Sequence, residues 1–220
     1  MQCFLLYWKG KNMPVIITSY GHACYKIEYN NASVILDPYE NGSVPGLQLP
    51  EGLEADRVLC SHGHHDHNAR GLVRETDKNP DAFSPVFINV PHDDAGGSKR
   101  GMSDISVLHA GKVTIIHFGD IGRLPEEDEY RKMEGADIIL IPAGGYYTID
   151  AEQAKEICER ICPKAVILMH FRKGEIGYPV LADFDAVKAV FPDVKTIPEG
   201  RMIFAEDSVP EGIFVLDPVQ

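Results

Sequence analysis

Residues 62–67 read His62-Gly63-His64-His65-Asp66-His67. Four imidazoles and one carboxylate thus fall within six positions. In an extended stretch, side chains at positions i and i+2 lie on the same side of the backbone, so His62 and His64 can bind one metal ion. Asp66 and His67 come after the bend and can reach a second ion. Nitrogen and carboxylate donors without a thiolate suit zinc, manganese, iron or nickel, and the stretch predicts a metal-binding loop.

The residues on either side of this loop support that prediction. The apolar run Val58-Leu59-Cys60 ends directly before the loop, and Leu72-Val73 suggests a helix after it. The alternative is a solvated histidine-rich loop that picks up metal adventitiously. The i, i+2 spacing and the position between two apolar segments both disfavour this alternative.

Three more donors follow apolar runs of strand length, at His92, Asp120 and His170. Open α/β sheets bind ligands along the edge where the carboxyl ends of their strands meet, so these donors are expected to converge. Two ions about 3.5–4 Å apart need a bridging carboxylate, and Asp120, after the flexible Gly119, fits that role. The predicted two-metal set is His62, His64, Asp66, His67, His92, Asp120 and His170.

His92 has a rival in His117. On a predicted strand, His117 is in phase with Val113 and Ile115, so its side chain should point into the core or support the ligands from behind. We favour His92 as the ligand, and the sequence alone leaves His117 open.

Two residues are candidates for orienting the metal loop rather than binding metal. Asp37 ends the apolar run Val34-Ile35-Leu36, which is typical of a buried carboxylate that holds a histidine ligand, or of a simple turn. His22, between Gly21 and Ala23, could hydrogen-bond to the same network or stabilise a turn.

Two other residues are candidates for contacting a substrate. Gly144-Gly145 lets the backbone approach a ligand closely, and Tyr146 after it could line the pocket or pack in a turn. Residues 96–101 have the composition of a mobile loop and carry Lys99 and Arg100. Arg100 could contact an anionic substrate group, or the segment could be a solvated loop.

Apolar, β-branched runs of strand length recur at residues 15–18, 24–29, 33–36, 58–60, 86–90, 113–117, 138–141, 165–169, 202–205 and 213–216. Helices are predicted over residues 125–134, 150–162 and 183–191. The clearest begins with a capping box between Asp150 and Gln153. Strands come first and then alternate with helices. This order predicts an α/β fold of two sheets with helices outside, a four-layer αββα sandwich.

The composition is that of a globular chain, with 44% hydrophobic and 25% charged residues in 220. We expect one domain over residues 13–220, with residues 1–12 as a dispensable, disordered extension. No apolar run approaches the roughly 18 residues of a membrane span, so we expect no membrane partner. The first residues lack a signal-peptide pattern, and a cytoplasmic protein is expected.

Cysteine content and charge narrow the possible partners. The five cysteines match no redox or zinc-knuckle spacing and are expected to be reduced. The net charge of −12 repels polyphosphate backbones, so no nucleic-acid partner is expected. Divalent cations would offset this charge locally, so the net charge does not exclude small anionic substrates. The oligomeric state stays open, homo-oligomers included.

With these motifs, the chain resembles the metallo-β-lactamase fold superfamily. The pattern of residues 62–67, in a loop that follows a strand ending in Asp, is specific to that superfamily. More narrowly, it is similar to a compact branch of metal-dependent hydrolases that includes sugar-phosphate lactonases. The similarity covers about residues 14–172. The matching stretches are Gly21-His22-Ala23, Ile35-Leu36-Asp37-Pro38, Gly119-Asp120, residues 141–150 and Met169-His170.

The resemblance implies an αββα sandwich of the metallo-β-lactamase type. It implies two metal ions, the first on His62, His64 and His92 and the second on Asp66, His67 and His170, with Asp120 as the bridge. Asp66 would also orient the attacking hydroxide, so Asp66 and Asp120 are the expected catalytic residues. One departure is Ile121, where the branch usually carries a threonine that supports the ligands through a hydrogen bond.

We therefore expect a metal-dependent hydrolase that uses a hydroxide activated by two metal ions on a small ester, lactone or phosphodiester. Zinc is the first choice of metal, with manganese, iron or nickel as alternatives. Two other functions stay open. One is an iron-dependent oxidoreductase on the same scaffold, and the other is a metal-binding regulatory module without turnover.

Overall fold

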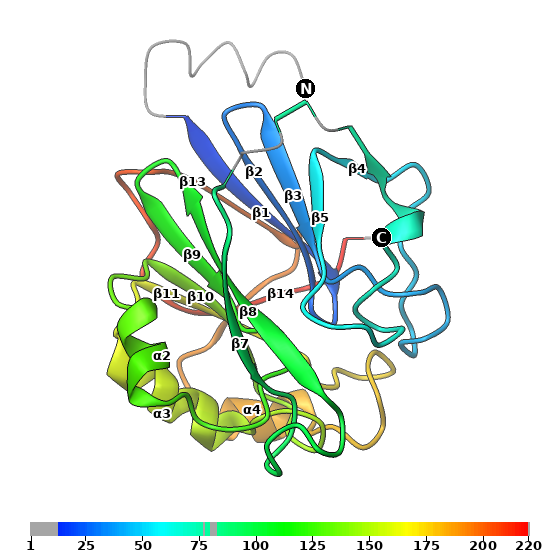
Figure 1. Cartoon of the computed structure of the whole chain (residues 1–220), viewed down its shortest axis with the longest axis vertical. Coiled ribbons are helices and arrows are strands. Elements are labelled where there is room, and N and C mark those ends of the chain that lie inside the picture. The colour runs from blue at the N-terminus through cyan, green and yellow to red at the C-terminus, as the bar shows by residue number, and fades with distance from the viewer. Residues whose placement is uncertain (1–12, 77, 80–82, 220) are drawn as a thin grey trace.

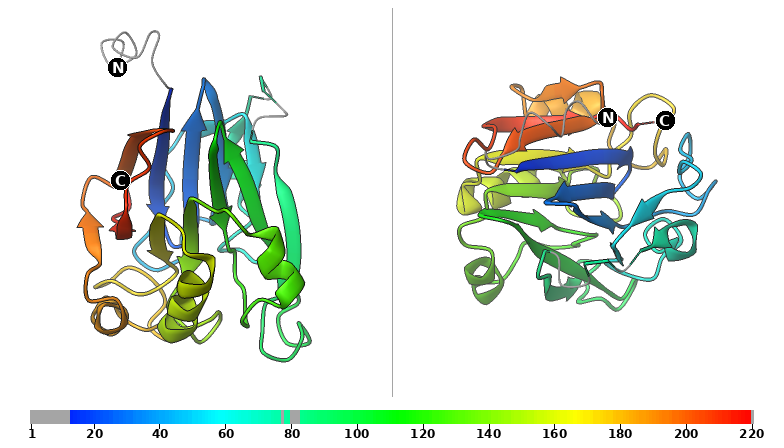
Figure 2. Two further views of the ribbon diagram at one scale, coloured as in Figure 1. Left: turned by 90° about the vertical axis from the view of Figure 1, so that its left-hand side faces the viewer. Right: turned by 90° about the horizontal axis from the view of Figure 1, so that it is seen from above.

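The protein is described by a computed structural model, which covers residues 13–76, 78–79 and 83–219 (Figure 1). The predicted disordered extension, residues 1–12, lies outside the described residues. Two β-sheets lie face to face, and helices cover the outer side of the larger sheet (Figures 1 and 2). The two-sheet arrangement expected from the sequence is therefore present.

The smaller sheet has five strands, in the order β13 (Arg201–Ala205), β1 (Pro14–Gly21), β2 (Cys24–Tyr29), β3 (Ala32–Leu36) and β5 (Arg57–Leu59). The larger sheet has seven strands, in the order β12 (Lys195–Ile197), β14 (Gly212–Leu216), β11 (Ala165–Met169), β10 (Ile138–Pro142), β9 (Val113–His117), β8 (Met102–Ala110) and β7 (Val86–Pro91). A separate pair is formed by β4 (Glu54–Ala55) and β6 (Arg74–Glu75). The remaining elements are the 3-10 helix η1 (Arg70–Leu72) and the helices α2 (Glu127–Lys132), α3 (Ala151–Ile161) and α4 (Phe184–Val190).

Apolar side chains fill both spaces between the layers. Between the sheets, Ile17 and Ile27 of the smaller sheet belong to one buried cluster with Ile115 and Ile167 of the larger sheet. A second cluster lies between the larger sheet and the helices. The outer face of the smaller sheet packs against apolar side chains of residues 39–53. Strands β10 and β11 are buried along their whole length, so the larger sheet contributes apolar side chains to both spaces.

The best-defined helix is α3. At its start, the Asp150 side chain accepts from the backbone N–H of Gln153 over 2.9 Å, and the Gln153 side chain accepts from the backbone N–H of Asp150 over 3.2 Å. The predicted capping box is confirmed. The helix ends at Cys162, whose φ of 54° is left-handed. Within the described residues, no helix combines the length and apolar character that crossing a membrane requires.

Three neighbouring parallel strands, β9, β10 and β11, end at the same edge of the larger sheet. Asp120 follows β9 and His170 follows β11, so both lie at that edge. His22, in the turn between β1 and β2, reaches the same edge, because its carbonyl oxygen accepts from the backbone N–H of His170 over 3.2 Å. The topology thus brings segments far apart in the sequence to one place.

Candidate metal centre

The centre of the site is the buried carboxylate of Asp120. Its Oδ2 lies 3.3 Å from Nε2 of His67, 3.4 Å from Nε2 of His92 and 3.3 Å from Nε2 of His170. These three histidines come from three different loops, and each is buried. Burial alone would raise the pKa of Asp120, but His170 and His67 outweigh it and hold the pKa well below its ordinary value.

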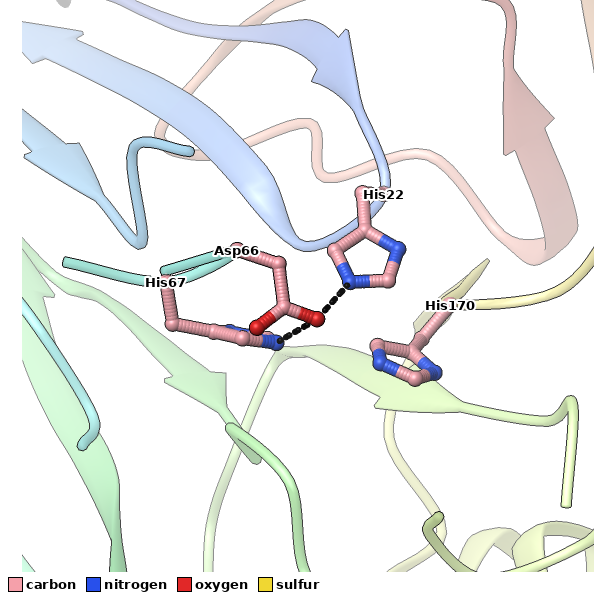
Figure 3. Close-up of side chains that lie close together, drawn as sticks. All are labelled: His22, Asp66, His67 and His170. Carbon is pink, nitrogen blue, oxygen red and sulfur yellow. Dashed lines mark hydrogen bonds and ion pairs between the residues drawn. The ribbon is translucent and has the colours of Figure 1, made fainter. Parts of the chain in front are cut away.

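Donor atoms around Asp120 form groups, and within each group they lie within 4.8 Å of one another. One group is His62, His64 and His92, and the other is His22, Asp66, His67 and His170 (Figure 3). A third group, His62, His67 and Asp120, joins the two. All seven donors of the predicted set therefore lie in one cluster, in which Asp120 contacts members of both groups.

The predicted orienting residue Asp37 holds His67 in place. Nδ1 of His67 donates to Oδ2 of Asp37 over 2.8 Å, so Nε2 faces Asp120. Ser61 donates to the same carboxylate twice, from its backbone N–H and its hydroxyl, each over 2.6 Å. Burial alone would lower the pKa of His67, but Asp120 and Asp37 outweigh it and hold the pKa well above its ordinary value.

Ser61 also fixes the protonation of His62. The single hydroxyl hydrogen of Ser61 is donated to Asp37, so the oxygen must accept from Nδ1–H of His62, which lies 2.9 Å away. Nε2 of His62 then carries a lone pair, and it faces Nδ1 of His64 at 2.9 Å. A nitrogen lone pair is what a metal ion requires. Sequence reasoning missed Ser61, since a serine after a strand carries no signal of its own.

His117 does not join the cluster, because both of its ring nitrogens are used elsewhere. Nε2 donates to the carbonyl oxygen of Ala23 over 2.9 Å, and Nδ1 accepts from the backbone N–H of Gly119 over 3.2 Å. The residue thus supports the turn that carries Asp120. Of the two rivals, only His92 has a nitrogen directed at the cluster.

Gly119 allows this turn to pack closely. Its φ is +52°, and a Cβ there would lie 2.7 Å from Cβ of Ser61 and 2.8 Å from Oγ of Ser103. That hydroxyl accepts from the backbone N–H of Asp120 over 3.0 Å. The glycine is therefore needed for close packing as well as for its backbone conformation.

Asp66 is held by two donors. Its Oδ2 accepts from Nε2 of His22 over 3.2 Å (Figure 3). The same oxygen accepts from the phenol of Tyr178 over 3.1 Å. Burial, with His170 beside it, lowers the pKa of His22 to about 3. A neutral His22 that donates from Nε2 fits the predicted orienting role. Sequence reasoning missed Tyr178, which lies in an irregular segment after β11 without periodic pattern.

Unpaired polar atoms are concentrated in the cluster. Buried side-chain atoms that lack a hydrogen-bond partner within the described part of the chain include Nε2 of His67, Oδ1 of Asp120 and Nε2 of His170. Buried polar groups without partners are rare in folded proteins, and each calls for a reason such as a missing ion. Imidazole and carboxylate donors in this arrangement fit a divalent cation.

The remaining predicted residues lie around the cluster. Tyr146 is 64% exposed, has a φ of +60°, and packs its ring against Tyr147. Tyr147 also contacts Tyr178, with 5.8 Å between the ring centroids. The guanidinium of Arg100 lies over the Tyr147 ring. Ile121 is fully buried in the apolar cluster under the helices, so its side chain does not support the donors.

Comparison with known proteins gives a consistent result. Residues 16–170 match the family described as beta-lactamase superfamily domain. A UPF0173 metal-dependent hydrolase of Carboxydothermus hydrogenoformans is 25% identical, over 85% of this chain and 98% of its own length. Another from Methanocaldococcus jannaschii is 29% identical, over 71% of this chain and 84% of its own length.

Comparison with solved structures supports the same fold. A candidate zinc-dependent hydrolase of the metallo-β-lactamase superfamily from Thermotoga maritima aligns with a TM-score of 0.68 and 22% identity. The alignment covers 91% of this chain and 97% of that one. The αββα sandwich expected from the sequence is thereby confirmed.

Proposed function

This chain belongs to the beta-lactamase superfamily, and from that premise we propose that it hydrolyses a small ester, lactone or phosphodiester at a centre of two divalent metal ions. Like its relatives, it is a metal-dependent hydrolase. The substrate class and the two-ion centre are the new elements of the proposal.

The observation that carries the proposal is the convergence of three imidazoles on one carboxylate oxygen, at 3.3–3.4 Å. Asp120 contacts two groups of donors, each large enough to hold an ion. A carboxylate shared between two groups has the placement of a bridge.

The proposed ligands follow the two groups. His62, His64 and His92 hold the first ion, and Asp66, His67 and His170 hold the second. His22 belongs to the second group by distance, but its Nε2 donates to Asp66, so we assign it to orienting that carboxylate. Zinc is the preferred metal for this nitrogen-rich set, with manganese, iron and nickel as alternatives.

Two such ions, when bound, would lower the pKa of water to about 7 and so would supply a hydroxide at neutral pH. The chain contributes orientation. Oδ1 of Asp66 makes no hydrogen bond to the described residues, so it can accept from the attacking water while His22 and Tyr178 hold Oδ2. Asp37 keeps His67 in the tautomer that directs Nε2 to the centre.

Metal analysis with a hydrolysis panel tests the proposal. Protein purified without added metal should carry two divalent ions per chain and turn over one class among lactones, simple esters and phosphodiesters. Asp120→Ala should lose the second ion and most turnover. Asp94→Ala is the matched control, because Asp94 is an exposed carboxylate two residues from His92 that pairs with Lys99. Unchanged metal content in Asp120→Ala would refute the bridge.

The same measurements separate the other two functions. A coloured protein that contains iron and consumes oxygen, without hydrolysis, would identify an oxidoreductase. A full complement of metal with no turnover on any member of the panel would identify a regulatory module.

A further inference from the structure

Hydrogen bonds to one buried carboxylate hold the backbone of the segment after His92. The carboxylate of Asp93, which is 2% exposed, accepts from four backbone N–H groups of this segment. The donors are Ala95 at 2.8 Å, Gly97 at 3.0 Å, Lys99 at 2.9 Å and Arg100 at 2.8 Å. Asp93 therefore fixes the backbone as far as Arg100.

This loop is also fixed relative to the metal centre. The backbone N–H of Gly122 donates to the carbonyl oxygen of Pro91 over 2.9 Å. A Cβ at Gly122 would lie 2.3 Å from the backbone nitrogen of Asp93, so the two segments touch without a gap. The positions of His92 and Asp120 thus set the position of Arg100.

The guanidinium of Arg100 has no hydrogen-bond acceptor among the described residues. Its Cζ lies 5.2 Å from the centroid of the Tyr147 ring, and within the described ranges it makes neither an ion pair nor a side-chain hydrogen bond. The other cation of the loop, Lys99, pairs with Asp94 over 2.7 Å. A guanidinium presents five N–H donors, so a half-buried one without acceptors is ready to bind an oxyanion.

Contacts connect this guanidinium to the metal centre from two directions. Tyr147 packs against Tyr178, whose hydroxyl donates to Asp66. On the other side, the backbone N–H of Arg100 bonds to Asp93, the residue directly after His92. Arg100 is therefore linked to Asp66 through Tyr147 and Tyr178, and to His92 through the backbone of Asp93.

We propose that Arg100, which lies over the Tyr147 ring, binds a carboxylate or phosphate group of the substrate at a distance from the scissile bond. The proposal rests on the hydrolase function above and adds the substrate class to it. In a chain of net charge −12, an anionic substrate needs a local cation, and a guanidinium can bind two oxygens of such a group at once. The Tyr147 ring attracts the guanidinium through a cation–π contact, with 5.2 Å between Cζ and the ring centroid.

The first test uses three lactones of one ring size that carry a distal hydroxyl, carboxylate or phosphate. The native enzyme should prefer one of the two anionic lactones, and this preference shows whether the site binds a carboxylate or a phosphate. In Arg100→Gln, the ratio of kcat/KM between that lactone and the neutral one should fall 10- to 100-fold, mainly through KM. Arg100→Lys should recover part of the ratio, and Lys99→Gln should keep all of it.

The second test does not need turnover. In chelator-treated protein, the side-chain Nε–H signal of Arg100, assigned by its absence in Arg100→Gln, should shift saturably with inorganic phosphate or acetate. Chloride at the same ionic strength should leave it in place.

The two tests fail in different ways. In one outcome, Arg100→Gln loses kcat/KM equally for neutral and anionic lactones, and the Arg100 signal does not shift. This outcome overturns the anion site and leaves the hydrolase function in place. A saturable shift without hydrolysis of any lactone supports the anion site and overturns lactone hydrolysis.

Discussion

The phenol of Tyr178 donates to Oδ2 of Asp66 over 3.1 Å, although the two residues lie 112 positions apart in the sequence. The same oxygen accepts from His22 over 3.2 Å. Two donors from different loops therefore set the orientation of a proposed ligand, and the segment after β11 is tied to the metal loop.

Removal of the Tyr178 hydroxyl should loosen Asp66. A hydrogen bond to a charged group contributes about 1.5–3 kcal/mol, so we expect Tyr178→Phe to lower kcat/KM about 10- to 100-fold, with weaker binding of the second ion. Steady-state kinetics and chelator competition measure the two effects. Tyr29→Phe is the control, because the Tyr29 hydroxyl also donates to a carboxylate, that of Glu206 over 3.4 Å, outside the cluster. If both variants match the native enzyme, His22 alone orients Asp66.

Asp37→Asn should weaken metal binding without removing a ligand. The native carboxylate accepts from His67 and twice from Ser61, and the loss of such a support typically lowers metal affinity 10- to 100-fold. Chelator competition gives the affinity, and urea unfolding gives the stability. Asp56→Asn is the matched control, since Asp56 is also buried and accepts from Ser33 and Thr76 outside the cluster. Equal metal affinity in the two variants would show that Asp37 has only a structural role.

Much of the donor set was predictable because local geometry determines it. The i, i+2 spacing of His62 and His64 and the strand-end positions of Asp120 and His170 depend on backbone periodicity and on the shared edge of parallel strands. Strands β2, β9 and β11 have the predicted bounds, since their apolar runs are uninterrupted.

What the sequence could not predict depends on long-range packing or on buried polar residues. The contact between Tyr178 and Asp66 exists only after the fold has formed. Strand β8 was missed because Ser103 and Ser106 are buried within it and interrupt the apolar pattern. The glycines of residues 96–101 suggested mobility, while the order of that loop comes from the carboxylate of Asp93.

Gly119→Ala should disrupt the metal centre. The new Cβ would lie only 2.7 Å from Cβ of Ser61. In addition, the left-handed φ of residue 119 costs about 1–2 kcal/mol for a residue with a side chain. Gly135→Ala separates the two effects, because Gly135 has a φ of +78° and nothing within 4 Å of a Cβ. We expect both variants to lose stability in thermal unfolding, Gly119→Ala more strongly, and only Gly119→Ala to lose metal. Full metal content in Gly119→Ala would show that the turn can shift without moving Asp120.

The stability of the metal-free protein should fall as the pH drops from about 6 to 4.5. Burial lowers the pKa of His22 to about 3, against an ordinary value of 6.5, so in this range the unfolded chain binds a proton that the folded chain does not. Each such proton lowers the free energy of unfolding by about 1.4 kcal/mol per pH unit. His67, whose pKa is raised, does not oppose this trend. Its contribution to the free energy of unfolding is complete below pH 6.5 and is lost only as the pH rises above that value.

Urea unfolding of chelator-treated protein at several pH values tests this prediction. The free energy of unfolding should depend on pH less steeply in His22→Gln than in the native chain, by about one proton. His65→Gln, at an exposed position near Glu40, is the control. Parallel slopes in His22→Gln and the native protein would mean that His22 takes up its proton equally in both states.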